Sequence, residues 1–150
     1  MRVVFSVVVA AIAALCFPGL TPAQALFAPD PTPLERPAPL KTLKSGDTAK
    51  ICDAIAKALT DTGFKVTNQD CDVGDFEATK KTSTAGEFDK VLIWLERDFE
   101  KPKDAVKLYF RYGRYETLAG HTEPVRIRTT AADEERNVGA LKEALTSLKI

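Results

Sequence analysis

Few side chains in this sequence could carry out catalysis. His121 is the only histidine, and it stands in a loop that also contains glycine and proline. Nucleophilic catalysis needs a base held against a serine, threonine or cysteine in a recognisable arrangement. No such motif surrounds Ser45, Ser83 or Ser147, and the sequence has no glycine-rich phosphate loop, paired-cysteine metal site or dinucleotide fingerprint. We therefore predict that the protein is not an enzyme and that it uses no metal or cofactor.

The acidic stretch at residues 70–75 has the alternating aspartates of a calcium-binding loop. The helix-loop-helix ligand pattern, however, would need an oxygen ligand where Gly74 stands and a bidentate glutamate where the chain has Lys81. The stretch therefore predicts a polar turn whose aspartates bind local backbone amides, with a weak, non-specific calcium site as the alternative. A hydrolase that works from Asp72 and His121 is the remaining enzymatic hypothesis.

Aromatic and basic residues alternate with apolar ones in the second half of the chain. If the apolar residues of these strands face a core, Leu92 and Lys107 lie on the water-facing side of the sheet, together with the five candidate binding residues named at the end of this paragraph. Aromatic rings beside guanidinium groups suit stacking on sugar rings and bidentate bonds to carboxylate or phosphate. The alternative is ordinary sheet stabilisation, in which cationic stems cover aromatic rings and Glu96 or Glu116 supplies cross-strand partners. The candidate binding residues are Trp94, Tyr109, Arg111, Arg126 and Arg128.

The first 25 residues predict a cleavable secretory signal. Arg2 precedes an apolar run at residues 3–17, and a small-residue triplet follows at residues 23–25. A membrane anchor is one alternative, but a span needs about 20 apolar residues and this run is shorter. Lipidation of Cys16 is another, although the residue before it is larger than the small one that precedes an acylated cysteine. Cleavage after residue 25 would leave no transmembrane span.

Removal of this leader leaves Cys52 and Cys71 as the only cysteines. An even number of cysteines in an exported chain predicts a disulfide, because the compartments beyond the membrane are oxidising. Closing a loop of about 20 residues would stabilise the fold by roughly 3 kcal/mol in the chain-entropy model. A metal or redox pair is the alternative, but the spacing is not Cys-x-x-Cys. We predict a periplasmic or secreted protein.

Charge limits the choice of partners. The chain carries 21 basic and 21 acidic residues, so its formal net charge is zero. Nothing in this balance predicts bulk attraction to nucleic acid or to an anionic membrane surface.

The stretch that follows the leader is rich in proline. Five of the nine prolines lie in residues 26–40. This composition predicts an extended tether over residues 26–44 that has no packed structure of its own. A ligand for a proline-binding partner is the alternative role for it. Residues 45–150 then form one domain.

Periodicity in that domain predicts a helix, a run of strands and a second helix. The first helix begins at Ser45 or Asp47 and ends at Gly63, which suits the left-handed position after a last turn. Apolar residues at helical spacing predict the last helix, which opens near Asp133. The expected fold class is α+β, a two-layer domain whose antiparallel sheet of four to five strands carries the N- and C-terminal helices on one face. A period of two predicts strands at residues 64–67, 76–81, 88–99, 106–115 and 125–129.

The first helix is followed by Gly63-Phe64-Lys65-Val66, a polar turn and Gly74-Asp75-Phe76-Glu77-Ala78-Thr79, and longer strands and a closing helix come after them. Over residues 45–149 this order resembles the small helix-grip domains of bacterial envelope lipoproteins, including barrel-assembly accessory proteins. The resemblance implies a non-catalytic envelope module that docks onto other proteins. Because the chain lacks a convincing lipidation box and adds Cys52 and Cys71, it does not imply membrane attachment here.

Two functional hypotheses follow from the sequence. The first is a secreted or periplasmic interaction module without catalytic activity, which holds an envelope protein partner by its sheet face or an edge strand. The alternative is a binder of an anionic glycan or small ligand on the basic and aromatic surface.

Overall fold

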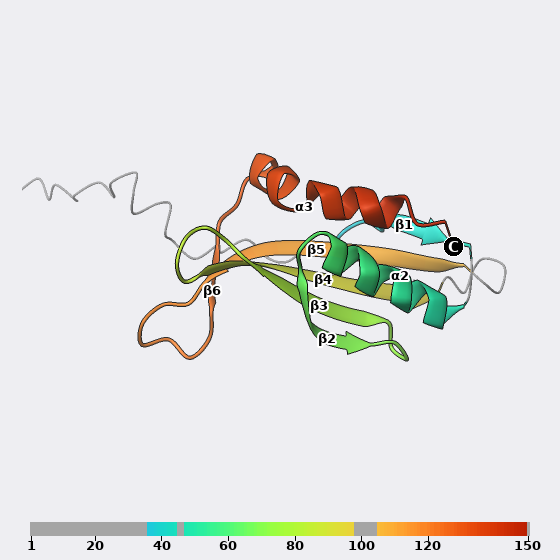
Figure 1. Ribbon diagram of the computed structural model, residues 1–150, viewed down its shortest axis with the longest axis horizontal. Coiled ribbons are helices and arrows are strands. Elements are labelled where there is room, and N and C mark those ends of the chain that lie inside the picture. The colour runs from blue at the N-terminus through green and yellow to red at the C-terminus, as the bar shows by residue number, and fades with distance from the viewer. Residues whose placement is uncertain (1–35, 45–46, 98–104, 150) are drawn as a thin grey trace, which may run out of the picture.

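The computed structural model describes residues 36–44, 47–97 and 105–149. The predicted leader, Cys16 and residues 26–35 of the predicted tether lie outside the described residues. The described part forms one six-stranded antiparallel sheet and two helices, as Figure 1 shows. In chain order its elements are β1 (Lys41–Leu43), α2 (Thr48–Asp61), β2 (Lys65–Asp70), β3 (Asp75–Lys81), β4 (Glu87–Arg97), β5 (Val106–Glu116), β6 (Val125–Ile127) and α3 (Ala131–Thr146).

Helix α2 begins and ends where the sequence predicts. The side chain of Asp47 caps its start by accepting the backbone N–H of Lys50 at 3.2 Å. Its end is a Schellman motif: Phe64 N–H donates to the Leu59 carbonyl at 2.9 Å, and Gly63 N–H donates to the Thr60 carbonyl at 3.0 Å. Gly63 has a φ of +82°, which glycine adopts without a Cβ penalty.

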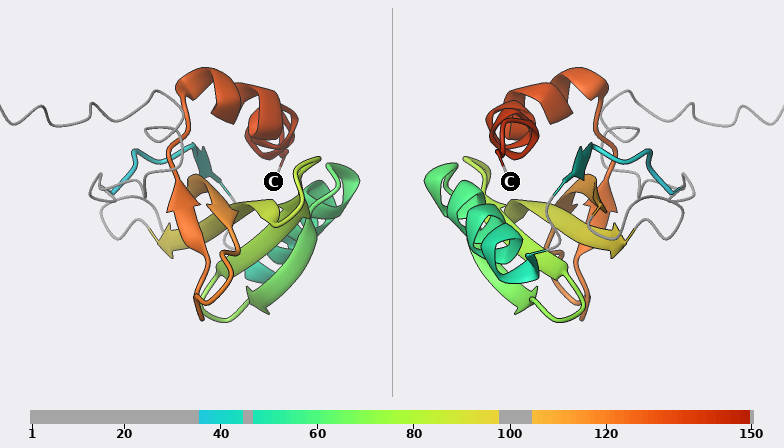
Figure 2. Two further views of the ribbon diagram at one scale, coloured as in Figure 1. Left: turned by 90° about the vertical axis from the view of Figure 1, so that its left-hand side faces the viewer. Right: turned by 90° about the vertical axis from the view of Figure 1, so that its right-hand side faces the viewer.

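The core lies on one face of the sheet. Strands β4 and β5 pair over their full lengths, and alternate residues such as Val91, Ile93 and Leu108 are at most 1% exposed. The helices contribute to the same hydrophobic cluster, so both cover this face and the predicted fold class is confirmed. Figure 2 shows α2 over the β2–β3 side of the sheet and α3 over the β1–β5 side. The buried helix residues are Ile51, Cys52, Ile55, Ala58 and Leu59 of α2 and Val138, Leu141 and Leu145 of α3.

The predicted disulfide is present between Cys52 and Cys71, whose Cα atoms are 5.8 Å apart. Cys52 lies in the first turns of α2 and is 1% exposed, whereas Cys71 follows β2 in the turn to β3. The bond therefore ties the start of the helix to the β2–β3 hairpin, at the edge of the sheet. The amide of Gln69 lies 3.3 Å and 3.2 Å from the two sulfur atoms.

The tether prediction is wrong for its last residues, because Lys41–Leu43 form strand β1 and pair with β5. Leu43 is 1% exposed in the core, and Leu40 N–H donates to the Leu108 carbonyl at 2.8 Å. Lys41 Nζ donates to the carbonyls of Thr146 and Leu148 at 2.6 and 2.5 Å. Thr146 is the last residue of α3 and Leu148 follows its C-cap, so Lys41 lies at the C-terminal end of the helix, where the helix dipole favours a cation. Strand β1 therefore links the sheet to the end of α3.

Two short strands share one edge of β5. Strand β1 pairs with the beginning of β5, and β6 pairs with its end through Arg114, Tyr115 and Glu116. The described sheet thus has six strands where four to five were expected. The last strand ends at Ile127 rather than at residue 129. Helix α3 follows with a capping box, in which Thr130 and Asp133 each bind the other's backbone N–H.

Replacing Leu43 with alanine should lower the free energy of unfolding by about 3 kcal/mol, because it empties a buried site. The matched control is Thr42→Ala on the same strand, whose side chain is exposed and should change stability by less than about 0.5 kcal/mol. Urea unfolding of the three proteins measures both. Equal stability of the two variants would show that β1 contributes nothing to the core.

Gly74 closes the β2–β3 turn at a φ of +88°, and a Cβ on it would lie 2.8 Å from Leu95 Cβ. Gly120 has a φ of +83°, and a Cβ added to it would have no heavy atom within 4 Å. Gly120→Ala should therefore cost about 1 kcal/mol from backbone strain alone, and Gly74→Ala about 3 kcal/mol because a clash is added. Thermal unfolding compares them, and a larger loss for Gly120→Ala would contradict this account of the turn.

Candidate functional site

The face of the sheet that points away from α2 and α3 is called here the outer face. Because successive residues of a strand point to opposite sides, the partners of the buried residues of β4 and β5 occupy it. The register places Trp94 opposite Tyr109, and Phe88 opposite Tyr115. Strand β3 adds Asp75 beside Trp94. The outer-face residues of β3, β4 and β5 are Asp75, Glu77, Thr79, Lys81, Phe88, Lys90, Leu92, Trp94, Glu96, Lys107, Tyr109, Arg111, Gly113 and Tyr115.

A cluster of aromatic and arginine side chains occupies one end of this face. The rings of Trp94 and Tyr109 are stacked, with centroids 5.3 Å apart and planes 7° from parallel. The guanidinium of Arg111 lies 5.5 Å from the Trp94 centroid, and that of Arg36 lies 5.3 Å from the Tyr109 centroid. Both distances are within the range of cation–π attraction. Tyr109 is consequently only 7% exposed, while Trp94 stays half-buried.

Glu96 holds this cluster together. Its Oε1 accepts the indole N–H of Trp94 at 3.3 Å and also pairs with the guanidinium of Arg36. Arg36 precedes β1, so this contact fixes the entry of the chain onto the outer face. Much of the aromatic surface at this end is therefore engaged within the protein, which agrees with the sheet-stabilising interpretation of these residues.

A second aromatic pair lies at the other end of β4. The rings of Phe88 and Tyr115 are 5.8 Å apart and 17° from parallel. Lys90 Nζ lies 6.0 Å from the Tyr115 centroid and forms an ion pair with Glu77 at 2.9 Å. Residue alternation alone places Phe88 and Tyr115 on the outer face, but their contact depends on the β4–β5 register.

The structure brings together only three of the five residues predicted to bind. Trp94, Tyr109 and Arg111 form one cluster, whereas Arg126 lies opposite Tyr115. Tyr115 lies six residue steps after Tyr109 on β5, which is about 20 Å along the strand. Arg128 follows the end of β6 and is exposed. The Arg126 backbone is therefore far from Trp94 along the sheet, although its side chain reaches back over β5, where Nε would lie 3.2 Å from a Cβ on Gly113.

Surface pockets, which we call hollows, lie in a row along the outer face. The Trp94 hollow, of about 440 Å³, has walls from four strands. The Tyr115 hollow, of about 460 Å³, is closed on one side by the β5–β6 loop, which lies on the side of the sheet away from α3 (Figure 1). Glu77 lines both. The side chains of the Trp94 hollow include Asn68, Asp75, Glu77, Leu92, Trp94 and Arg111, and those of the Tyr115 hollow are Glu77, Thr79, Phe88, Lys90, Tyr115, Glu123 and Pro124.

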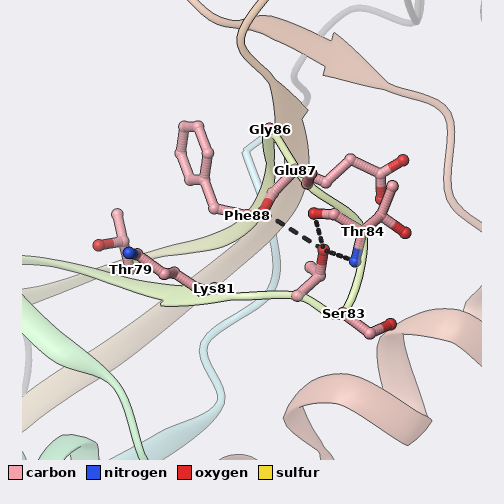
Figure 3. A pocket seen from close by; sticks show the side chains of 9 residues that line it. Thr79, Lys81, Ser83, Thr84, Gly86, Glu87 and Phe88 are labelled. Carbon is pink, nitrogen blue, oxygen red and sulfur yellow. Dashed lines mark hydrogen bonds between the residues drawn. The ribbon is translucent and has the colours of Figure 1, made fainter.

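A third hollow of about 570 Å³, the hairpin hollow, lies at the β3–β4 turn. Figure 3 shows Thr79 and the ring of Phe88 on one side of it and the turn residues Ser83 and Thr84 on the other. The Thr82 hydroxyl braces this turn through contacts with the carbonyl of Glu87 at 3.3 Å and the backbone of Thr84 at 3.2 Å. Because Thr79 and Phe88 also line the Tyr115 hollow, the three hollows follow one another along β3 and form what we call the outer-face groove.

The residues considered for catalysis, Asp72 and His121, do not line this groove. Asp70 Oδ1 accepts the backbone N–H groups of Asp72 and Val73 at 3.0 and 3.1 Å, as expected for a polar turn. His121 is exposed in the β5–β6 loop, where its backbone N–H donates to the Leu118 carbonyl at 3.1 Å. Within the described ranges, no group of three His, Cys, Asp or Glu side chains is placed to hold a metal ion.

A buried polar network lies on the opposite, helix-covered face. Asp89, 4% exposed, accepts the hydroxyl of Tyr112 at 2.7 Å and Nε of Arg114 at 3.0 Å. The amide of Asn137 in α3 donates to the same hydroxyl at 3.1 Å. Burial, and then the hydrogen bond to Asp89, raise the pKa of Tyr112 above its ordinary value of 10.0. The network joins β4 and β5 to α3.

No protein-family model matches the chain, and no curated protein shows significant sequence similarity to it. Neither described helix is long and apolar enough to cross a membrane.

Tyr112→Phe should make the stability of the protein less sensitive to alkaline pH. Below pH 10 the Tyr112 hydroxyl is protonated in both the folded and the unfolded state, and its stabilising effect is fully present. Above pH 10 this hydroxyl ionises in the unfolded chain before it ionises in the folded protein, so wild-type stability falls by up to about 1.4 kcal/mol per pH unit. Urea unfolding at pH 8 and pH 11 measures this loss. The wild type should be about 1–2 kcal/mol more stable than the variant at pH 8, with a smaller difference at pH 11. Parallel losses in the two proteins would contradict the raised pKa.

Proposed function

We propose that the protein is a non-catalytic interaction module of the periplasm or the extracellular space, and that it holds a protein partner in the outer-face groove. The observation that carries this proposal is the groove itself. The sheet buries one face under both helices and leaves the other hollowed along β3, with aromatic and charged side chains in its walls. Concave surfaces with a few convergent polar groups are common binding sites.

The charges of the groove favour a protein partner over an anionic glycan. Arg111 shares the Trp94 hollow with Asp75, whose carboxylate repels a polyanion. Arg126 and Arg128 stand on and after β6, which pairs with the opposite end of β5 from the Trp94–Tyr109 pair. A protein surface, which carries both signs of charge, complements such a groove more readily.

The disulfide supports export of the protein. Structural disulfides persist in oxidising compartments and are rare in the cytosol of most organisms. The Cys52–Cys71 bond fixes α2 against the β2–β3 hairpin, so the position of two groove strands depends on it. This arrangement fits the sequence expectation of a leader that directs the chain across a membrane, and the likeness to helix-grip envelope domains remains part of the same proposal.

Site-specific photo-crosslinking in cells that naturally export the protein tests the proposal. A photo-reactive amino acid at Thr79, which lines two of the hollows, should give an adduct of higher mass with a partner protein. The matched control is Thr60, an exposed threonine on α2, which should give none. Equal adducts at both positions, or no adduct at Thr79, would contradict a groove that holds a protein.

A further inference from the structure

The shape of the outer-face groove indicates the form of its partner. The hollows follow Asp75, Glu77, Thr79 and Lys81, which are alternate residues of β3. Six residue steps along a strand span about 20 Å. A site that is long and open along its length accommodates an extended chain rather than a compact small molecule.

The two aromatic pairs lie at the ends of this path. Trp94 and Phe88 are six residues apart on β4, so the Trp94–Tyr109 and Phe88–Tyr115 pairs are also separated by about 20 Å. Exposed ring surface attracts cationic side chains, and the protein itself makes such contacts at both pairs through Arg111 and Lys90. Further basic side chains, with their long aliphatic stems, therefore suit the remaining ring surface.

The carboxylates of the groove also favour basic side chains in the partner. Glu77 is neutralised by Lys90, but Asp75 and Glu123 form no ion pair with any residue that the structure describes. Asp75 belongs to the Trp94 hollow at one end of the path and Glu123 to the next hollow along it, so the two carboxylates stand at different positions on the path. An extended segment with one basic side chain for each of them would be complementary in charge.

The chain's own proline-rich segment does not have this complementarity. Residues 26–35 contain two acidic residues, Asp30 and Glu35, and no lysine or arginine. Their charge has the same sign as Asp75 and Glu123. The charge pattern thus favours a segment of another protein as the occupant.

We propose that the outer-face groove binds an extended, basic segment of a partner protein, with two lysine or arginine side chains directed at Asp75 and Glu123. This inference rests on the proposed function and adds the chemistry of the partner. At about 3.3 Å per residue, the two basic residues stand roughly four to six positions apart in the segment.

Selection from a displayed library of random ten-residue peptides tests the inference, using the mature chain with its disulfide intact. Selected peptides should have a net positive charge and a pair of basic residues at the stated spacing. Trp94 is the only tryptophan of the chain, so its fluorescence should change as a selected peptide is added. Neutral or acidic peptides, or the selection of none, would overturn the inference.

Variants that remove the two carboxylate charges test whether a selected peptide binds at Asp75 and Glu123. Asp75→Asn combined with Glu123→Gln should lower the affinity for a selected basic peptide about fivefold to tenfold, because two partly exposed ion pairs are lost. The matched control combines Asp53→Asn with Glu135→Gln, two exposed carboxylates on α2 and α3, and should leave affinity unchanged. Equal weakening by both pairs, or none by the groove pair, contradicts the inference.

The two proposals fail in different ways. Acidic peptides that still change Trp94 fluorescence, together with an adduct at Thr79, would refute the basic partner and keep the groove as a protein-binding site. Absence of the adduct together with peptides that leave Trp94 unaffected would refute both.

Discussion

Eleven consecutive residue pairs join β4 to β5, and this ladder decides which side chains are inside the protein. A slip of one residue would turn every side chain to the opposite face. Val91 and Ile93 would then face water, and Lys90 and Leu92 would face the helices. The observed register buries the apolar set under α2 and α3 and leaves the charged and aromatic set outside. The helix-covered face therefore provides the stability, and the outer face is the surface on which we propose that a partner binds.

Contacts around the β4–β5 ladder hold the two helices against the sheet. The disulfide holds α2 to the β2–β3 hairpin, Lys41 of β1 binds the last turn of α3, and Asn137 connects α3 to the network of Asp89. These attachments lie on the core side or at the edges of the sheet. The outer face carries the Arg36 contacts at one end and the β5–β6 loop at the other, with the groove between them.

Local signals predicted much of this fold, and long-range pairing accounts for what they missed. The cap at Asp47, the stop at Gly63 and the alternation in β3, β4 and β5 are encoded within a few residues of each position. Strand β1 has three residues after a proline-rich run, and it forms because Leu43 reaches a distant core site. Alternation also placed Arg126 and Trp94 on one face, but their separation along the sheet depends on strand register, which a single sequence does not reveal. The contact of Arg36 with Tyr109 had no sequence signal for the same reason.

Two adjacent residues of β4 test the division between the faces most directly. Ile93 points into the core and Leu92 into the Trp94 hollow, and each can be replaced by threonine, which strands tolerate well. The free energy of unfolding in urea should fall by about 3 kcal/mol for Ile93→Thr and by less than about 1 kcal/mol for Leu92→Thr. Equal losses, or a larger loss for Leu92→Thr, would show that the outer face is needed for folding and would contradict its assignment as a surface for binding.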